Sequence, residues 1–175
     1  DWTYKEGKAK TVDNIDFTKR VANGPTDRGF DYFYGLTSPS GPPHLYMVND
    51  MAEKQPNTRF EESGGGLYKI KGGIGHSDWS ADGMQPHLAD KMLEYLDENK
   101  DSDKPFFLYM ALTALHIPLF PSKEFKGKSK IGDYGDLVMM IDDIVGRVNR
   151  KLKEIGKYDN TIVMFDADNG CAGYI

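Results

Sequence analysis

The chain of 175 residues is 39% hydrophobic and 28% charged, a composition typical of a globular domain rather than a disordered segment. Its net charge is −5, and its 22 Lys and Arg residues are scattered among 27 acidic residues without a basic run, which argues against a nucleic-acid partner. No apolar stretch approaches the roughly 20 residues that cross a bilayer, so no membrane association is expected.

Residues 1–83 are predicted to be rich in loops, because glycine and proline cluster there, as in residues 38–43 and 64–66. Within this half, residues 29–35 are aromatic and bounded by glycines, which predicts a short strand. Three further side chains of this half could shape a substrate pocket, although packing or surface exposure is the simpler interpretation. They are His44, Tyr46 and Trp79.

The second half, residues 84–175, is predicted to contain two amphipathic helices. Residues 85–99 place Leu88, Met92 and Leu96 on one face, with His87 expected in solvent in the first turn. Residues 133–155 repeat apolar side chains at intervals of three and four and are followed by Gly156, a common residue just after a helix.

Two apolar runs in this half predict strands that are buried in a parallel sheet. Residues 105–112 follow the first helix and residues 161–165 follow the second, so the order is helix, strand, helix, strand. The fold class is therefore α/β, with a mostly parallel sheet flanked by helices. Because two strands cannot form such a sheet alone, the chain is expected to be a fragment of a larger domain.

Polar residues follow both predicted strands. Ligands of open α/β sheets bind beyond the carboxyl ends of the strands, so residues 113–118, with His116, and residues 166–170 should lie at one edge. Carboxylate and amide oxygens suit calcium or magnesium, which makes Asp168 and Asn169 candidate metal ligands. From the residues alone, a turn in which Asp and Asn cap backbone amides fits equally well, and a packed loop histidine is the simpler interpretation of His116.

Five motifs, taken in order, resemble the sulfatase family of the alkaline phosphatase superfamily. They are residues 105–109, 113–118, 132–136, 159–161 and 168–170, and residues 22–31 also look like a stretch found in arylsulfatase-like members. The resemblance implies an alkaline-phosphatase-like sandwich, so that residues 1–175 are part of a sulfatase catalytic domain. It also implies that Asp168 and Asn169 bind Ca²⁺, with Mg²⁺ possible, and that His116 contacts the sulfate as a catalytic and substrate-binding residue.

The chain departs from the family pattern at two places. Leu115 stands where the family has proline in the loop of the histidine. Family catalysis uses a formylglycine made from Cys or Ser in a Cys/Ser-x-Pro-x-Arg motif, and no such motif occurs in the 175 residues. Cys171, the only cysteine, is followed by Ala172 and Gly173 and does not qualify. The formylglycine is therefore expected outside this stretch, and the fragment alone should be inactive.

The function that the resemblance implies is calcium-assisted hydrolysis of a sulfate ester by attack of formylglycine on sulfur. The substrate would be a sulfated small molecule or a sulfated glycan, and relatives suggest a periplasmic or secreted location. Two alternatives stay open: a phosphodiesterase or phosphatase of the same superfamily, and a non-catalytic module that binds metal or sulfated glycans.

Overall fold

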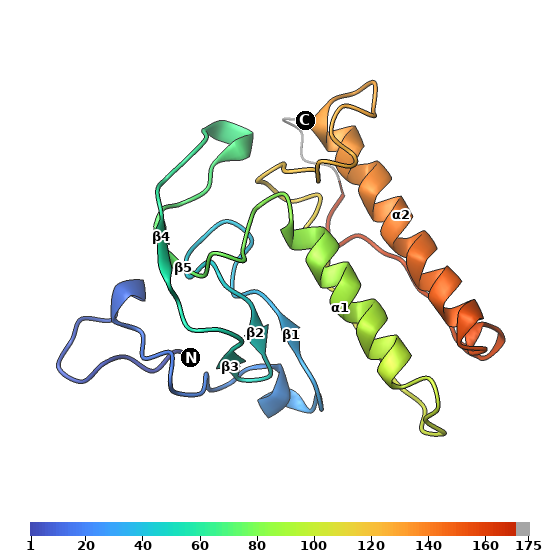
Figure 1. Cartoon of the computed structure of the whole chain (residues 1–175), viewed down its shortest axis with the longest axis horizontal. Helices are drawn as coiled ribbons and strands as arrows, with labels where there is room; N and C mark the ends of the chain where they lie inside the picture. Colours follow the sequence, from blue (N-terminus) through green and yellow to red (C-terminus); the bar gives the residue numbers. More distant parts are fainter. Residues whose placement is uncertain (171–175) are drawn as a thin grey trace.

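The two halves of the chain fold differently, as their composition predicts. In the computed structural model, which describes residues 1–170, the first half consists of loops with short strands, and the second half carries two long helices (Figure 1). The chain terminus labelled N lies within the loop-rich half, and the helices lie beside it.

The first half contains two small antiparallel sheets. One has the strand order β1-β2-β3 and the other pairs β4 with β5. The strands are β1 (Tyr34–Gly35), β2 (Met47–Val48), β3 (Met51–Ala52), β4 (Thr58–Phe60) and β5 (Gly73–Gly75). Short 3-10 helices are η1 (Val12–Asn14), η2 (Pro25–Arg28), η3 (Gly66–Tyr68) and, in the second half, η4 (Tyr158–Asn160). The strand predicted at residues 29–35 is confirmed only over its last two residues.

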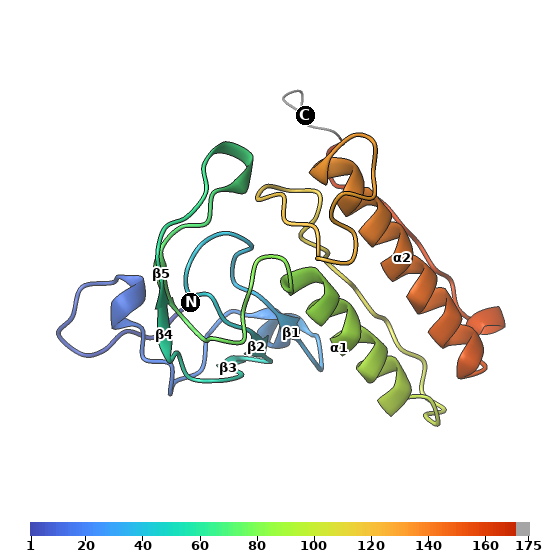
Figure 2. The same cartoon turned by 45° about the horizontal axis from the view of Figure 1, so that its top comes forward.

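Both predicted helices are present, as α1 (Met84–Glu98) and α2 (Asp133–Glu154). They run side by side in the same direction in both views (Figures 1 and 2). Acidic residues occupy the first turn of α2 and basic residues its last turn, which suits the helix dipole. Gly156 then adopts a left-handed backbone conformation, with φ of 68°, and stops the helix as predicted.

The main hydrophobic core lies between the two helices and the loop that joins them. Its fully buried members are Ala89 of α1, Leu119 of the loop, and Leu137, Met140 and Ile144 of α2. The α2 residues recur at intervals of three and four, so one stripe of the helix faces α1. Burial of this stripe stabilises α2, since in proteins most of a helix's stability comes from packing of its apolar face.

The two apolar runs are not strands in the described residues, and the prediction that they are buried in a parallel sheet is wrong here. Residues 105–112 and 161–165 form no strand in the structure, and each runs back along the preceding helix (Figure 2). Phe107 is 74% exposed and Ile162 is 87% exposed, whereas a strand buried on both faces would expose neither.

The physical reason is the lack of a pairing partner. Residues 106, 108, 110 and 112 are partly buried, whereas 107, 109 and 111 are exposed, so the segment is extended with alternating sides. One side packs on the helices through Met110 and Leu112. A run of β-forming residues becomes a strand only when a neighbour supplies ladder hydrogen bonds, and within residues 1–170 no segment does so.

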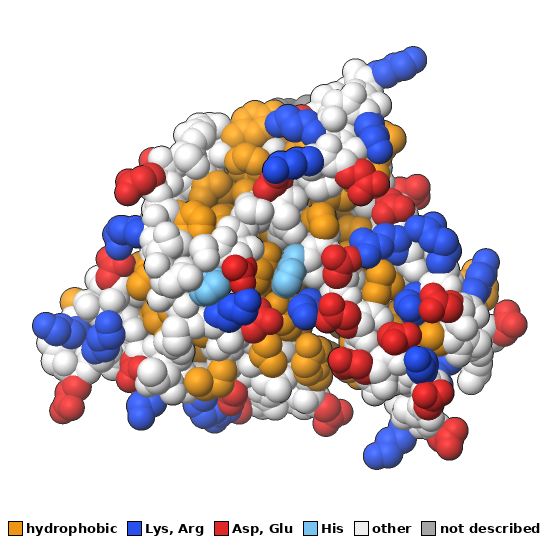
Figure 3. Space-filling model, in the orientation of Figure 1, with side chains coloured by type: hydrophobic (Ala, Val, Ile, Leu, Met, Phe, Trp, Pro, Cys, Tyr) orange, Lys and Arg blue, Asp and Glu red, His pale blue; other side chains and the backbone are white. Residues whose placement is uncertain are grey.

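Acidic and basic side chains are interspersed on the face of the molecule that Figure 3 shows. Among residues 1–170, no helix combines the length and apolar character needed to cross a bilayer. Cys171, considered above as a nucleophile precursor, lies outside the described residues.

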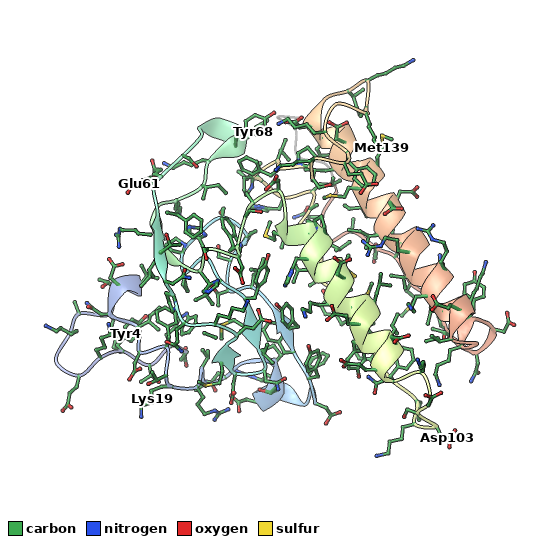
Figure 4. The ribbon with its side chains drawn as sticks, in the orientation of Figure 1. Tyr4, Lys19, Glu61, Tyr68, Asp103 and Met139 are labelled. Atoms are coloured by element: carbon green, nitrogen blue, oxygen red, sulfur yellow. The ribbon has the colours of Figure 1, made fainter. Side chains whose placement is uncertain are left out.

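Adjacent methionines on α2 test the core directly. Met140 is 2% exposed and packs toward α1, whereas Met139 is 42% exposed and lies on the outer side of α2 (Figure 4). We expect Met140→Ala to lower the free energy of unfolding by about 2–4 kcal/mol through lost burial and a residual cavity. Met139→Ala should cost less than about 1 kcal/mol. Urea titration followed by circular dichroism measures both, and equal losses would contradict the packing described.

Candidate functional site

His116 lies in an exposed position on the loop between α1 and α2. The backbone N–H of His116 donates to the carbonyl of Thr113 over 3.1 Å, which closes a turn under the imidazole. The ring nitrogen Nδ1 lies 2.5 Å from the carbonyl oxygen of Ile117. Because a carbonyl oxygen only accepts, Nδ1 carries the proton, and Nε2 is the nitrogen left to face a ligand.

A small cavity of about 10 Å³ lies beneath the loop that carries His116. Its lining comes from four parts of the chain, namely Pro39, Met84 and Gln85 of α1, Thr113, Ala114, His116, Pro118 and Phe120 of the loop, and Leu137 of α2. A space of this size holds about one water molecule. The side chains under His116 therefore pack the loop onto the helices and do not form a pocket for substrate.

Gln85 is a polar residue of this lining that the sequence analysis missed. It falls on the same helical face as Ala89, Met92 and Leu96, and all four side chains are buried. The signal was available in the sequence, because a glutamine at a core position of an amphipathic helix is an exception that calls for a buried hydrogen-bond partner.

Asp168 and Asn169 lie in an exposed turn after the second apolar run. Gly170 has φ of 79°, so the backbone makes the sharp turn expected there. The amide nitrogen of Asn169 lies 3.3 Å from an oxygen of the Asp168 carboxylate and donates to it, so the amide oxygen of Asn169 is turned away from that carboxylate. A carboxylate and an amide oxygen are ligand types that suit a hard cation such as Ca²⁺, but Ca²⁺ takes six to eight oxygens and this arrangement does not bring the two oxygens together. Within the described chain, no three His, Cys, Asp or Glu side chains are grouped to hold a metal.

The loop of His116 and the turn of Asp168 and Asn169 are not directly bonded to each other within the described residues. Over residues 1–170, no hydrogen bond or ion pair joins residues 113–118 to residues 166–170. The expected common edge requires the two preceding runs to be neighbouring parallel strands, and they are not paired. Whether the three residues share one site is therefore a prediction that stays untested.

A second group of titratable side chains joins the loop-rich half to α1. The Tyr34 hydroxyl donates to Glu53 over 2.8 Å and accepts from Nε2 of His87, 2.7 Å away. The ring of His87 stacks on Tyr46 with 4.1 Å between centroids, and the Lys91 amine lies 5.5 Å from the centre of the Tyr34 ring. The expectation that His87 is solvated is wrong, because these aromatic rings half-bury it.

Burial shifts the ionisation of this group. It lowers the pKa of His87 and raises the pKa of Tyr46 to about 12, and burial together with the adjacent Glu53 raises the pKa of Tyr34. The neutral imidazole and neutral phenols are therefore favoured near pH 7. Sequence patterns could not show this group, since Tyr34 and His87, which are hydrogen-bonded, lie 53 residues apart in the chain.

His44 and Trp79 are packed in the core of the first half, as the simpler interpretation of the sequence expects. Their ring centroids are 4.4 Å apart, and Phe60 contacts both rings edge-on. The Nε2 proton of His44 is donated to the carbonyl of Lys71 over 2.7 Å. The other nitrogen, Nδ1, is buried without a hydrogen-bond partner among the described residues, so charging this ring is costly.

The family model described as Sulfatase matches residues 3–174 of the chain. The chain belongs to the sulfatase family. Curated relatives include N-acetylgalactosamine-6-sulfatase of Rattus norvegicus, 44% identical over 80 residues, which are 46% of this chain and 15% of the relative. An N-acetylgalactosamine-6-O-sulfatase of Bacteroides thetaiotaomicron is 33% identical over 92 residues, 53% of the chain and 18% of the relative. An uncharacterized sulfatase of Escherichia coli is 31% identical over 83% of the chain and 23% of the relative.

A solved sulfatase structure has a similar fold. It comes from a Bacteroides thetaiotaomicron locus for metabolism of multiple glycosaminoglycans, and it superposes with a TM-score of 0.67 at 23% identity. The match covers 83% of this chain and 37% of that structure. This similarity confirms the predicted α/β, alkaline-phosphatase-like fold class of the present chain. The predicted parallel sheet is not seen in residues 1–170. The sulfatase chain spans less than a quarter of each of the three curated relatives above.

The burial of His44 predicts a pH dependence of the sulfatase chain's stability. Burial lowers the His44 pKa below its ordinary 6.5, so the unfolded chain binds the proton more readily. The stability contributed by the neutral ring is present above about pH 6.5 and is lost as the pH falls toward the folded-state pKa. We expect His44→Gln to be less stable at pH 7.5 but to lose less stability between pH 7 and about 5 than the parent chain.

Denaturant titrations across this pH range measure the effect. His116→Gln serves as the control, because it removes an exposed histidine that lies outside the core. Parallel pH profiles for the parent chain and His44→Gln would show that His44 does not carry the dependence.

Proposed function

We propose that the chain is part of an enzyme that hydrolyses sulfate esters, with a sulfated glycan as the substrate class. The match of the sulfatase family model to residues 3–174 carries this proposal. Two of the relatives are named for removing sulfate from N-acetylgalactosamine, which supports a sulfated amino sugar over other esters. Action in the periplasm or outside the cell belongs to the same proposal and rests on the family resemblance alone.

The chain would form a portion of the catalytic domain, with the formylglycine nucleophile supplied by residues outside it. The extended segment 105–112 supports this arrangement. Its one side packs on the helices through Met110 and Leu112, while Phe107 and Tyr109 on the other side are exposed. Exposed aromatic side chains on one side of an extended run suit a strand whose second face is covered by another layer of a larger domain.

His116 would bind the sulfate group and stabilise charge that develops on it during hydrolysis. The hydrogen bond from Nδ1 to Ile117 holds the ring and leaves Nε2 free. In its protonated form, Nε2–H would donate to a sulfate oxygen or to the departing alcohol oxygen. Since His116 is exposed on its loop, it can reach a ligand without displacing core side chains.

Asp168 and Asn169 would supply two of the oxygen ligands of a Ca²⁺ ion, with the remaining ligands coming from other residues. When bound, this ion would act as a Lewis acid on a sulfate oxygen. The donor chemistry of a carboxylate next to an amide and the sharp turn at Gly170 support this role.

The role of His116 is tested by His116→Ala in the full-length protein that contains this chain. We expect kcat for an aryl sulfate to fall by about 100-fold or more, because an oriented donor to the reacting group is lost. His76→Ala is the matched control, since His76 lies after β5 and hydrogen-bonds to Asn57. Unchanged turnover of the His116 variant would remove it from the site, and hydrolysis of aryl phosphate in preference to aryl sulfate would favour a phosphatase.

The metal ligands are tested by Asp168→Ala in the same full-length protein. After chelation, the variant should require at least about tenfold more Ca²⁺ to recover half-maximal activity, because a charged ligand is lost. Asp166→Ala is the control, since the Asp166 carboxylate accepts from its neighbour Ala167 and is not a proposed ligand. Equal Ca²⁺ requirements for both variants would argue against Asp168 as a ligand.

A further inference from the structure

Gln85 occupies a position where helix α1 would otherwise present an apolar side chain. It is 3% exposed and lies one turn before Ala89, on the face that packs in the core. A buried amide is unfavourable unless hydrogen bonds replace those it made with water. The hydrogen-bond partners of Gln85 therefore indicate its role in the structure.

Those partners are the first residues of the His116 loop. The end of the Gln85 side chain faces the backbone N–H groups of Thr113 and Ala114 and the hydroxyl of Thr113. Because these groups are donors, the amide oxygen is the atom that faces them, at 2.9 Å from the Thr113 nitrogen, 2.5 Å from the Ala114 nitrogen and 2.5 Å from the hydroxyl oxygen. One side chain thus satisfies two backbone donors of a loop that has no strand partner.

The other end of this loop is held by the tip of the β4–β5 hairpin. The backbone N–H of Leu119 donates to the carbonyl of Leu67 over 2.8 Å, and the rings of Tyr68 and Phe120 meet edge-on at 6.1 Å. Figure 4 labels Tyr68 at this tip, where η3 approaches the loop. His116 lies between the two anchoring points.

The position of the His116 imidazole depends on that of Thr113, because a hydrogen-bonded turn joins the two residues. The His116 N–H donates to the Thr113 carbonyl, which belongs to the same peptide unit as the Ala114 N–H that Gln85 holds. A shift of the Thr113–Ala114 backbone would therefore tilt the turn and move the ring, although Gln85 itself does not reach the exposed side of His116.

We infer that Gln85 is a positioning residue: its buried amide oxygen clamps the Thr113 and Ala114 N–H groups and so sets the place of His116 for catalysis. The catalytic part of this inference rests on the proposed function, in which His116 contacts the sulfate. The clamp itself is independent of that function. It links the interior of α1 to the exposed imidazole through a single side chain.

Three variants of the full-length protein test the clamp. Gln85→Met keeps the length and removes the acceptor, Gln85→Glu keeps two acceptor oxygens, and Met92→Ala weakens the same buried face of α1 without a bond to the loop. We expect Gln85→Met to raise hydrogen exchange at the Thr113 and Ala114 amides by about tenfold or more. It should also lower kcat by about tenfold, with a smaller change in KM.

Gln85→Glu should retain kcat within about threefold, since a carboxylate that accepts backbone N–H bonds is stabilised by them. Met92→Ala should lose thermal stability yet keep the loop protected and kcat near the parent value. If Met92→Ala loses as much kcat as Gln85→Met, the inference is overturned, because the loss of kcat in Gln85→Met would then follow from lower stability alone. Unchanged exchange at residues 113 and 114 in Gln85→Met would overturn it as well.

Gln85→Asn provides a second approach if Gln85→Met does not fold. The shorter amide stays polar but cannot reach both N–H groups, so exchange at Ala114 should rise while the fold persists. If the parent protein hydrolyses no sulfate ester, the proposed function fails. The exchange measurements still decide whether Gln85 clamps the loop, so the two failures are distinguishable.

Discussion

The packing of α1 against α2 is the contact on which the rest of the second half depends. Ala89 is fully buried at this contact, and its small side chain lets Leu137, Met140 and Ile144 of α2 approach α1 closely. The loop between the helices lies over the same core, through Leu119 and partly buried neighbours. The loop that carries His116 packs on this core, so loss of the packing would change both the stability of the helix pair and the position of His116.

Buried polar groups fix the loop between the helices at defined points on this hydrophobic core. Gln85 holds the middle of the loop at Thr113 and Ala114. The Asp136 carboxylate, fully buried in the first turn of α2, accepts from Gly127 N–H over 2.6 Å and from Ser129 N–H over 2.5 Å. Burying a carboxylate is costly, but two N–H donors and the positive end of the helix dipole offset the cost. The long connection is thus ordered by side chains of the helices that it joins.

The sequence predicted the parts of this fold that depend on local spacing. Both helices and the stop at Gly156 follow from intervals of three and four residues and from glycine chemistry. Strands depend on distant partners, so the two longest β-like runs remain unpaired, while two-residue strands such as Met47–Val48 form where antiparallel neighbours meet. The same limit applies to Gln85 and to the contact between Tyr34 and His87, which arise only when separate segments come together.

The candidate site was found from motifs, but its assembly depends on the unpaired runs. His116 follows residues 105–112, and Asp168 and Asn169 follow residues 161–165, so each functional group is placed by the carboxyl end of one run. In the proposed catalytic domain, pairing these runs as parallel neighbours would bring both carboxyl ends to one edge, and a layer covering the sheet would bury the exposed Phe107 and Ile162. Completion of the sheet and convergence of imidazole and metal ligands would then be one event, because the same backbone hydrogen bonds set both.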